Sequence, residues 1–144
     1  MTTPPLQLDG YCIDRFEFTA LTSFKEARGT IEVEVSVEPQ HMTRVDDPHS
    51  HQIVLDVRFK PVSSGSAPYK GRIIGRGFFR ITEELDEAAT ARYVLLNGSA
   101  ILLGLLRGHV AQSTALGRWG QFLIPPVNLV EAFENTAVLA REDG

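Results

Sequence analysis

Alternation of apolar and polar residues with a period of two dominates the first half of this 144-residue chain. Its clearest stretch, residues 31–37, alternates glutamates and a serine with four apolar residues: Ile31, Val33, Val35 and Val37. Similar stretches cover residues 6–18, 53–59 and 71–81, and a change of phase near Gly10 predicts a bulge or bend. Glycine, proline and aspartate clusters separate the stretches. The pattern predicts four half-buried strands in an antiparallel sheet.

Helical spacing of apolar residues begins only after the fourth of these strands. Thr82, followed by four acidic residues, predicts a helix start with Thr82 as the N-cap. A long helix is expected over about 88–112, an apolar loop over 113–126 and a second helix over about 127–140. Strands first and helices afterwards predict an α+β fold, a single domain over residues 1–144 with a sheet at about 6–81 and both helices on one face.

Three glycines interrupt the long predicted helix, at Gly98, Gly104 and Gly108. Each costs about 1 kcal/mol relative to alanine in a helix interior. We therefore expect another helix or the sheet to approach this helix closely.

Composition limits the function classes. A formal charge of −4 with a pI near 5.5 argues against general affinity for nucleic acid. Cys12 is the only cysteine, which excludes an intramolecular disulfide and favours a reducing compartment. The N-terminus lacks a signal-peptide pattern, so a cytoplasmic protein is expected. Residues 93–111 are apolar but include Arg107 and His109, which indicates a buried or oligomer-facing helix and no membrane insertion.

No constellation of residues predicts catalysis, and neither an enzyme nor a cofactor is expected. Cys12 is interpreted as a packed strand cysteine. His49 and His51, near His41 and two aspartates, fall short of a metal site and are interpreted as a solvated connector. Gly75-Arg76-Gly77 has no helix directly after it, so it predicts a bend or a close backbone approach, not a phosphate loop.

The arginine row Arg72, Arg76 and Arg80 lies on the polar face of the fourth predicted strand. If acidic strands lie beside it, cross-strand charge pairs explain the row, with Glu32, Glu34, Glu38 and Asp56 as the expected partners. The alternative is an RNA-binding face, whose affinity would fall steeply with salt.

The predicted loop contains the chain's only tryptophan, Trp119, followed by Phe122, Leu123 and Ile124 and then by Pro125-Pro126. The double proline prevents a helix there. Large apolar groups on a glycine-flanked loop favour a surface that binds other apolar groups. A lid over the core is the alternative interpretation of Trp119.

Taken together, the order of elements and several segments resemble the SecB family of export chaperones. Similar segments are Leu6–Phe18 with the first strand, His51–Val57 with the third, Tyr69–Phe79 with the fourth, and Gly117–Phe133 with the helix-connecting loop and second helix. Pro125-Pro126-Val127-Asn128 is the most specific part. The resemblance covers residues from about 6 to 135.

This resemblance implies a four-stranded antiparallel sheet with two helices, assembled as a dimer of dimers. It implies an ATP-independent holdase that binds unfolded or pre-export polypeptides, with a chaperone dedicated to one partner, such as an antitoxin, as the alternative. By analogy, the groove would be lined by loop and helix residues and, more weakly, by a strand residue: Trp119, Phe122, Ile124, Leu102, Leu105, Leu106 and Phe78.

The chain departs from the family on the outer face of the sheet. Members carry acidic residues there that dock the translocation ATPase SecA. At the corresponding positions this chain has Arg15, Thr19 and Arg72. Basic groups repel a partner that is built to meet acids, so these residues argue against SecA docking. The acidic C-terminal tail of many members is also missing.

Overall fold

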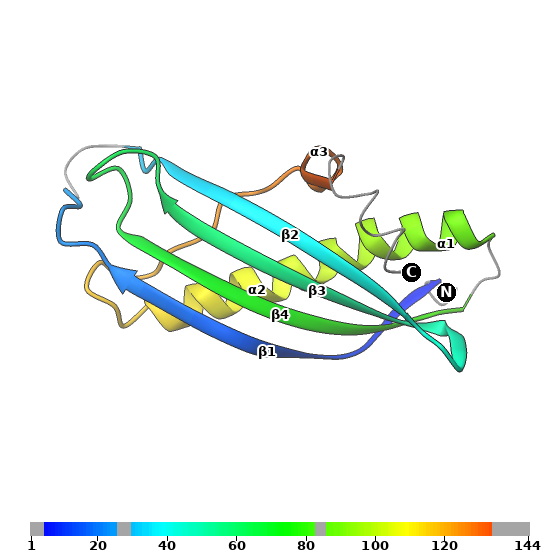
Figure 1. The fold of residues 1–144 in the computed structure, drawn as a ribbon. Helices are drawn as coiled ribbons and strands as arrows, with labels where there is room; N and C mark the ends of the chain where they lie inside the picture. The colour runs from blue at the N-terminus through cyan, green and yellow to red at the C-terminus, as the bar shows by residue number, and fades with distance from the viewer. Residues whose placement is uncertain (1–4, 26–29, 83–85, 134–144) are drawn as a thin grey trace.

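Four long strands form one antiparallel sheet in the computed structural model, which describes residues 5–25, 30–82 and 86–133. The strands are β1 (Leu6–Ala20), β2 (Val33–Arg44), β3 (Asp47–Pro61) and β4 (Tyr69–Ile81). Their order across the sheet is β1-β4-β3-β2, and each neighbouring pair is antiparallel (Figure 1). This arrangement confirms the predicted α+β fold.

The register of β1 against β4 shifts twice, between Leu8 and Gly10 and between Ile13 and Arg15. The first shift confirms the bend predicted near Gly10. The second was not visible in the alternation pattern. Because each shift moves the side chains to the other face, β1 presents Phe16 and Phe18 to the same side of the sheet as the apolar residues of β4.

The prediction for the second strand was wrong at both ends. Ile31 lies outside the strand and is exposed, whereas β2 continues past Val37 to Arg44. The hairpin with β3 runs through Pro39, which pairs with Leu55. A proline is tolerated here because β2 is an edge strand. The proline hid this extension in the sequence.

One continuous helical segment follows the sheet. It consists of α1 (Glu87–Tyr93), a π-helical turn η2 (Val94–Gly98) and α2 (Ser99–Thr114). The predicted N-cap was wrong: the Asp86 carboxylate accepts a hydrogen bond from the Ala89 amide at 2.7 Å. Thr82 instead donates its hydroxyl to the Pro5 carbonyl at 3.2 Å.

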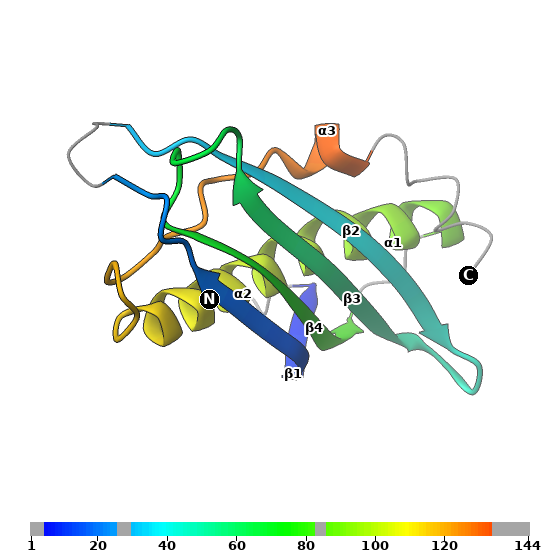
Figure 2. The same cartoon turned by 60° about the vertical axis from the view of Figure 1, so that its left-hand side comes forward.

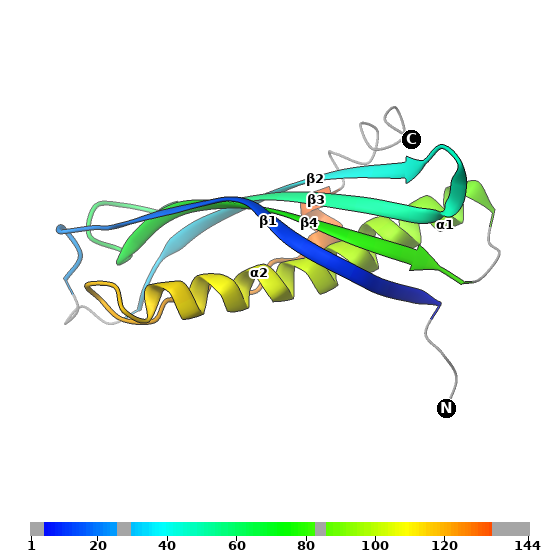
Figure 3. The ribbon, with the colours of Figure 1, turned by 90° about the horizontal axis from the view of Figure 1, so that it is seen from below.

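The helix packs diagonally across one face of the sheet, and no described helix covers the other face (Figures 1 and 3). The core lies between these layers. Its largest fully buried side chains come from β3, β4, the helix and the following loop: Tyr69, Phe59, Phe79, Ile53, Leu55, Ile73, Leu102, Leu106 and Ile124. The face covered by the helix is called the inner face below, and the opposite one the outer face.

Two glycines allow the helix to approach the sheet. A Cβ on Gly75 would lie 2.4 Å from a methyl carbon of Leu106, and a Cβ on Gly98 would lie 3.3 Å from Ile53. The close approach expected at Gly98 is therefore confirmed. Gly104 and Gly108 are different, because no described atom lies within 4 Å of a Cβ built on either. Their expected close contact is not made by the described part of this chain.

The continuous helix Glu87–Thr114 is 28 residues long and is apolar enough to cross a membrane by length and composition alone. Half of its most apolar window is buried inside the molecule, against the sheet and loop. One such helix is weak support for a membrane span, because the core helix of a globular domain passes the same test.

After α2 the chain runs without regular structure to α3 (Leu129–Phe133), beside β2 (Figure 2). The Asn128 side chain accepts a hydrogen bond from the Glu131 amide at 3.2 Å, as an N-cap does. The helix therefore starts at Leu129 and not at the predicted Val127. Residues 134–140 of the predicted second helix lie outside the described residues.

Candidate functional site

The segment between α2 and α3, residues 115–128 and called the connecting loop below, is held to the core by a buried tyrosine of β4. The Tyr69 hydroxyl donates to the Gly120 carbonyl at 2.8 Å and accepts from the Trp119 amide at 3.0 Å. A Cβ on Gly117 would lie 2.6 Å from the same hydroxyl oxygen. The loop can pass this closely because a glycine stands there.

The helix supplies two further attachments. Thr114, the last residue of α2, donates its hydroxyl to the Val110 carbonyl at 2.8 Å and accepts from the Phe122 amide at 2.9 Å. About two turns earlier, the Arg107 Nε donates to the Ile124 carbonyl at 2.7 Å. Backbone groups of an extended loop are thus satisfied by helix side chains, which fixes its position over the core.

Trp119 fastens the start of the loop to the chain that follows β1. Its indole nitrogen donates to the Leu21 carbonyl at 2.9 Å, and its ring meets Phe24 edge-on with centroids 5.1 Å apart. The Arg118 guanidinium lies over the Trp119 ring, 5.2 Å from the ring centroid. Trp119 is half-buried in this arrangement, as the lid interpretation expects.

The structure gathers most of the predicted groove residues on the inner face. Four of them are buried: Leu102, Leu106, Phe122 and Ile124. Phe122 packs on Phe59 with ring centroids 5.4 Å apart. Leu105 and Trp119 remain half-exposed. Phe78 is separated from all of them, because it lies on the outer face of β4 and is 40% exposed.

Sequence reasoning missed two exposed apolar residues of the connecting loop, Leu116 and Leu123. Leu123 is 63% exposed, while its neighbours Phe122 and Ile124 are buried. The loop is extended, so successive side chains point to opposite sides, as in a strand. The groove predicted from the sequence included Phe122 and Ile124 and omitted Leu123, which this alternation places on the opposite, exposed side.

An apolar strip also runs along the inner side of β1, the free edge strand next to β4. Leu8 and Tyr11 are exposed, Ile13 and Phe16 are half-exposed, and Phe16 meets His109 of α2 edge-on at 5.3 Å. The two register shifts in β1 bring these residues to one side, which the plain alternation pattern did not reveal.

His49 and His51 were expected in a solvated connector, and that expectation was wrong, because both lie on strand β3. His51 is buried and stacks on the buried His41 of β2, with His41 Nε2 3.0 Å from His51 Nδ1. Burial, with a smaller effect of His51, lowers the pKa of His41 to about 4. Burial also lowers the pKa of His51. The described residues contain no group of three or more His, Cys, Asp or Glu side chains that could hold a metal ion.

Cys12 was interpreted as a packed cysteine, and this too was wrong. It pairs with Arg76 in the β1–β4 register, which places it on the outer face, where it is exposed. Its thiol lies 3.7 Å from the Asp14 carboxylate.

The outer face confirms that the arginine row is balanced by acids on neighbouring strands. Arg72 contacts Asp56 at 2.7 Å, Arg76 contacts Asp14 at 3.1 Å, and Arg80 lies 3.6 Å from Asp47. Of the acidic partners expected from the sequence, Asp56 is the one found in these three contacts. The other two acids, Asp14 and Asp47, were not predicted, because strand register decides which residues lie opposite the arginines. The Arg72 hydrogen bonds hold the pKa of Asp56 below its usual value, and Asp56 raises the pKa of Arg72.

Comparison with known proteins defines the class of fold. No protein-family model matches the chain, and no curated protein matches it in sequence. Among solved structures, the Mycobacterium tuberculosis Rv1957 SecB-like chaperone, in complex with a ChAD peptide from the Rv1956 HigA1 antitoxin, is similar with a TM-score of 0.66 and 14% identity. The match covers 86% of this chain and 91% of that one.

A second similar structure is a protein of unknown function from Streptococcus agalactiae, with a TM-score of 0.53 and 14% identity. That match covers 84% of this chain and 97% of the other. The chain therefore has the fold of a SecB-like chaperone, at a low sequence identity of 14%. The resemblance inferred from the sequence is confirmed at the level of the fold.

Proposed function

We propose that this protein is an ATP-independent chaperone that binds extended apolar segments of other polypeptides and is not an enzyme. One observation carries the proposal: the fold is shared with a SecB-like chaperone over most of both chains, and in that structure the chaperone holds a peptide. The exposed apolar residues beside the connecting loop support it. Burial of apolar surface supplies about 25 cal/mol per Å², without a need for a particular client sequence.

Client contact would begin at the accessible apolar groups, Leu123, Leu105 and Trp119. The buried residues Leu102, Leu106, Phe122 and Ile124 would form the floor of a deeper groove. Access to that floor requires the loop to leave Tyr69 and Thr114, which now bind its backbone. The loop is therefore proposed as a displaceable cover over the client groove.

Aggregation suppression tests this proposal. A slowly refolding, unrelated protein is diluted from denaturant with and without this chain, in the absence of ATP, after light scattering has given the mass of the assembly. Leu123→Asp should abolish suppression, because a charge replaces the exposed apolar contact. Val45→Asp, in the fully exposed β2–β3 turn, is the matched control and should act as the unchanged protein does. Equal suppression by both variants would remove the loop from the mechanism.

A second candidate function is a chaperone dedicated to one partner, such as an antitoxin. The similar Rv1957 structure, which contains an antitoxin peptide, favours it. A well-folded assembly that suppresses no aggregation, yet binds the product of a neighbouring gene through the same Leu123-dependent surface, would identify this narrower function. It would also leave a role in protein export without support.

The chaperone is proposed to act as a homo-oligomer, a dimer of dimers. Gly104 and Gly108 lie one turn apart on the exposed side of α2, although alanine would stabilise the helix at both positions. A second copy packed closely against this side would explain them. Gly104→Ala with Gly108→Ala should reduce the assembly mass. An unchanged mass with a protein more stable by about 2 kcal/mol would exclude this side as an interface.

A further inference from the structure

The outer face of the sheet has an open hollow that the proposed client groove does not use. It has a volume of about 540 Å³ and crosses all four strands near one end of the sheet. Its rim carries four cations and two carboxylates: Arg58, Lys60, Lys70, Arg72, Glu17 and Glu34. The rim is therefore positive although the whole chain has a formal charge of −4. This set is called the basic hollow.

Strand register brings like charges together in the basic hollow. Arg58 of β3 and Arg72 of β4 are direct cross-strand partners, and Lys60 and Lys70 follow on the same face toward the same end. Directly opposed like charges destabilise a sheet. Such an arrangement gains free energy when an anionic group binds between the cations.

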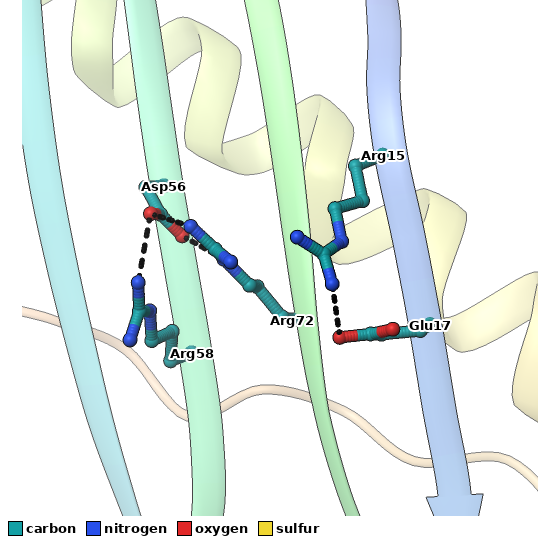
Figure 4. Close-up of polar contacts among 5 residues, drawn as sticks. All are labelled: Arg15, Glu17, Asp56, Arg58 and Arg72. Atoms are coloured by element: carbon teal, nitrogen blue, oxygen red, sulfur yellow. Dashed lines mark hydrogen bonds and ion pairs between the residues drawn. The ribbon is translucent and has the colours of Figure 1, made fainter.

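The acids within the sheet compensate only part of this charge. Asp56 binds Arg72 through two hydrogen bonds, at 3.0 and 2.7 Å, and reaches Arg58 only at 3.4 Å (Figure 4). On the other side of the hollow, Glu17 is engaged by Arg15 at 3.1 Å. Arg72 is thus held in place, while Arg58 makes the longer contact with Asp56 and its side chain is 56% exposed.

The positive charge of the two lysines is neutralised by neighbouring acids to a still smaller extent. Lys60 lies 3.9 Å from Glu34, at the limit of an ion pair, and both side chains are largely exposed. Lys70 forms no ion pair with any residue in the described ranges and is exposed. Arg58, Lys60 and Lys70 therefore form a set of available cations, arranged around a concave surface.

We propose that the basic hollow is a docking surface for an acidic polypeptide segment of a partner protein. An extended acidic segment fits it better than a nucleic acid, because a peptide can place uncharged residues opposite Glu17 and Glu34, whereas these carboxylates would repel a continuous line of phosphates. The hollow also lacks exposed aromatic rings on which bases could stack, since Phe18 and Phe59 are directed to the inner face. The surface is separated from the connecting loop by the sheet, so a client and this partner can bind together.

Fluorescence anisotropy with a labelled peptide of about twelve alternating Glu and Ser residues tests the proposal, with a Gln–Ser peptide as the uncharged probe. The full-length protein should bind the acidic peptide and not the uncharged one. Lys60→Glu with Lys70→Glu should weaken binding by about tenfold or more. Arg44→Glu with Arg92→Glu makes the same change in net charge far from the hollow and should leave binding within about twofold.

A second variant is expected to bind the acidic peptide more tightly, a result that loss of folding cannot produce. Glu17→Gln with Glu34→Gln removes two repulsive carboxylates from the rim and should strengthen binding of the acidic peptide severalfold. Equal weakening by the Lys60/Lys70 and Arg44/Arg92 pairs would show a nonspecific charge effect and overturn the proposal. Tighter binding of an oligouridine probe than of the peptide, lost in the Lys60/Lys70 variant, would overturn the choice of a polypeptide.

Discussion

The two faces of the sheet are built from the same strands but use opposite means of stabilisation. On the inner face, apolar residues of β3 and β4 are fully buried beneath α2 and the connecting loop. On the outer face, the side chains between them form ion pairs that remain partly solvated, such as Arg76 with Asp14. Burial carries most of the free energy of folding, whereas exposed ion pairs contribute little. The inner face should therefore decide stability, and the outer face should decide which charged molecules the protein meets.

The largest test of this comparison uses one residue type on both faces. Phe59→Ala removes a fully buried ring that packs on Phe122 and should cost about 3–5 kcal/mol in the free energy of unfolding. Phe78→Ala, on the outer face and 40% exposed, should cost about 1 kcal/mol or less. Urea unfolding followed by circular dichroism measures both. Similar losses for the two variants would contradict the comparison.

The next test concerns the attachment of the connecting loop. Tyr69→Phe removes the hydroxyl that binds Trp119 and Gly120, and should cost about 1–3 kcal/mol because the buried loop amide loses its acceptor. The emission of Trp119, the only tryptophan, should shift to longer wavelength as its ring becomes more exposed. Tyr11→Phe, at an exposed site on β1, is the matched control. An unshifted emission in Tyr69→Phe would mean that the indole bond to Leu21 holds the loop without Tyr69.

As the pH falls, the histidine pair should lose its contribution to stability before the outer-face ion pair of Asp56 does. The folded pKa of His41 is lowered to about 4 from 6.5, so the unfolded chain binds more protons as the pH falls between these values. Stability contributed by the neutral His41–His51 pair should therefore fall in this window. Asp56 acts later: its pKa lies below 3.8 in the folded protein, so its contribution is lost only as the pH falls below that value.

Unfolding measured from pH 7 to pH 4 checks the histidine window. His41→Phe should flatten the decrease, because the ring that resists protonation is gone. His51 would keep the Thr43 hydroxyl as a neutral hydrogen-bond partner, at 3.3 Å. A decrease of the same slope in His41→Phe would assign the acid sensitivity to other groups.

The smallest effect is expected for a single ion pair of the outer face. Arg76→Gln removes the contact with Asp14, whose side chain is 38% exposed, and should change the free energy of unfolding by less than about 1 kcal/mol. The measurement is the shift in thermal midpoint at low and at high salt, since screening should reduce the effect further. A loss of unfolding free energy as large as that of Phe59→Ala would show that ion pairs of the outer face also contribute strongly to stability.

The sequence by itself determined the class of fold and most of its elements. Strict alternation in residues 53–59 and 71–81 leaves one possible buried face for each strand, because a shift by one residue would expose every apolar side chain. The single stripe of leucines after residue 88 determined the long helix in the same way. Segments such as Pro125–Asn128 were specific enough to indicate the SecB-like fold that the structure confirms.

Other features depended on contacts between distant residues. The end of β2 at Arg44, the burial of His41 and the exposure of Cys12 all follow from pairing register, which no local pattern contains. Asp86 is the N-cap instead of Thr82, whose hydroxyl binds the Pro5 carbonyl, seventy-seven residues earlier in the chain.

The candidate site shows the same division. The apolar composition of the connecting loop was evident from the sequence, but Tyr69, the residue that holds it, lies fifty residues before Trp119 and resembled any strand tyrosine. The basic hollow arises because four strands place their charged residues side by side on a twisted surface. Local sequence sets which residues a strand can bury, since side-chain parity is a local property. Only the tertiary structure decides which polar groups meet, because hydrogen bonds and ion pairs depend on register between strands that are far apart in the chain.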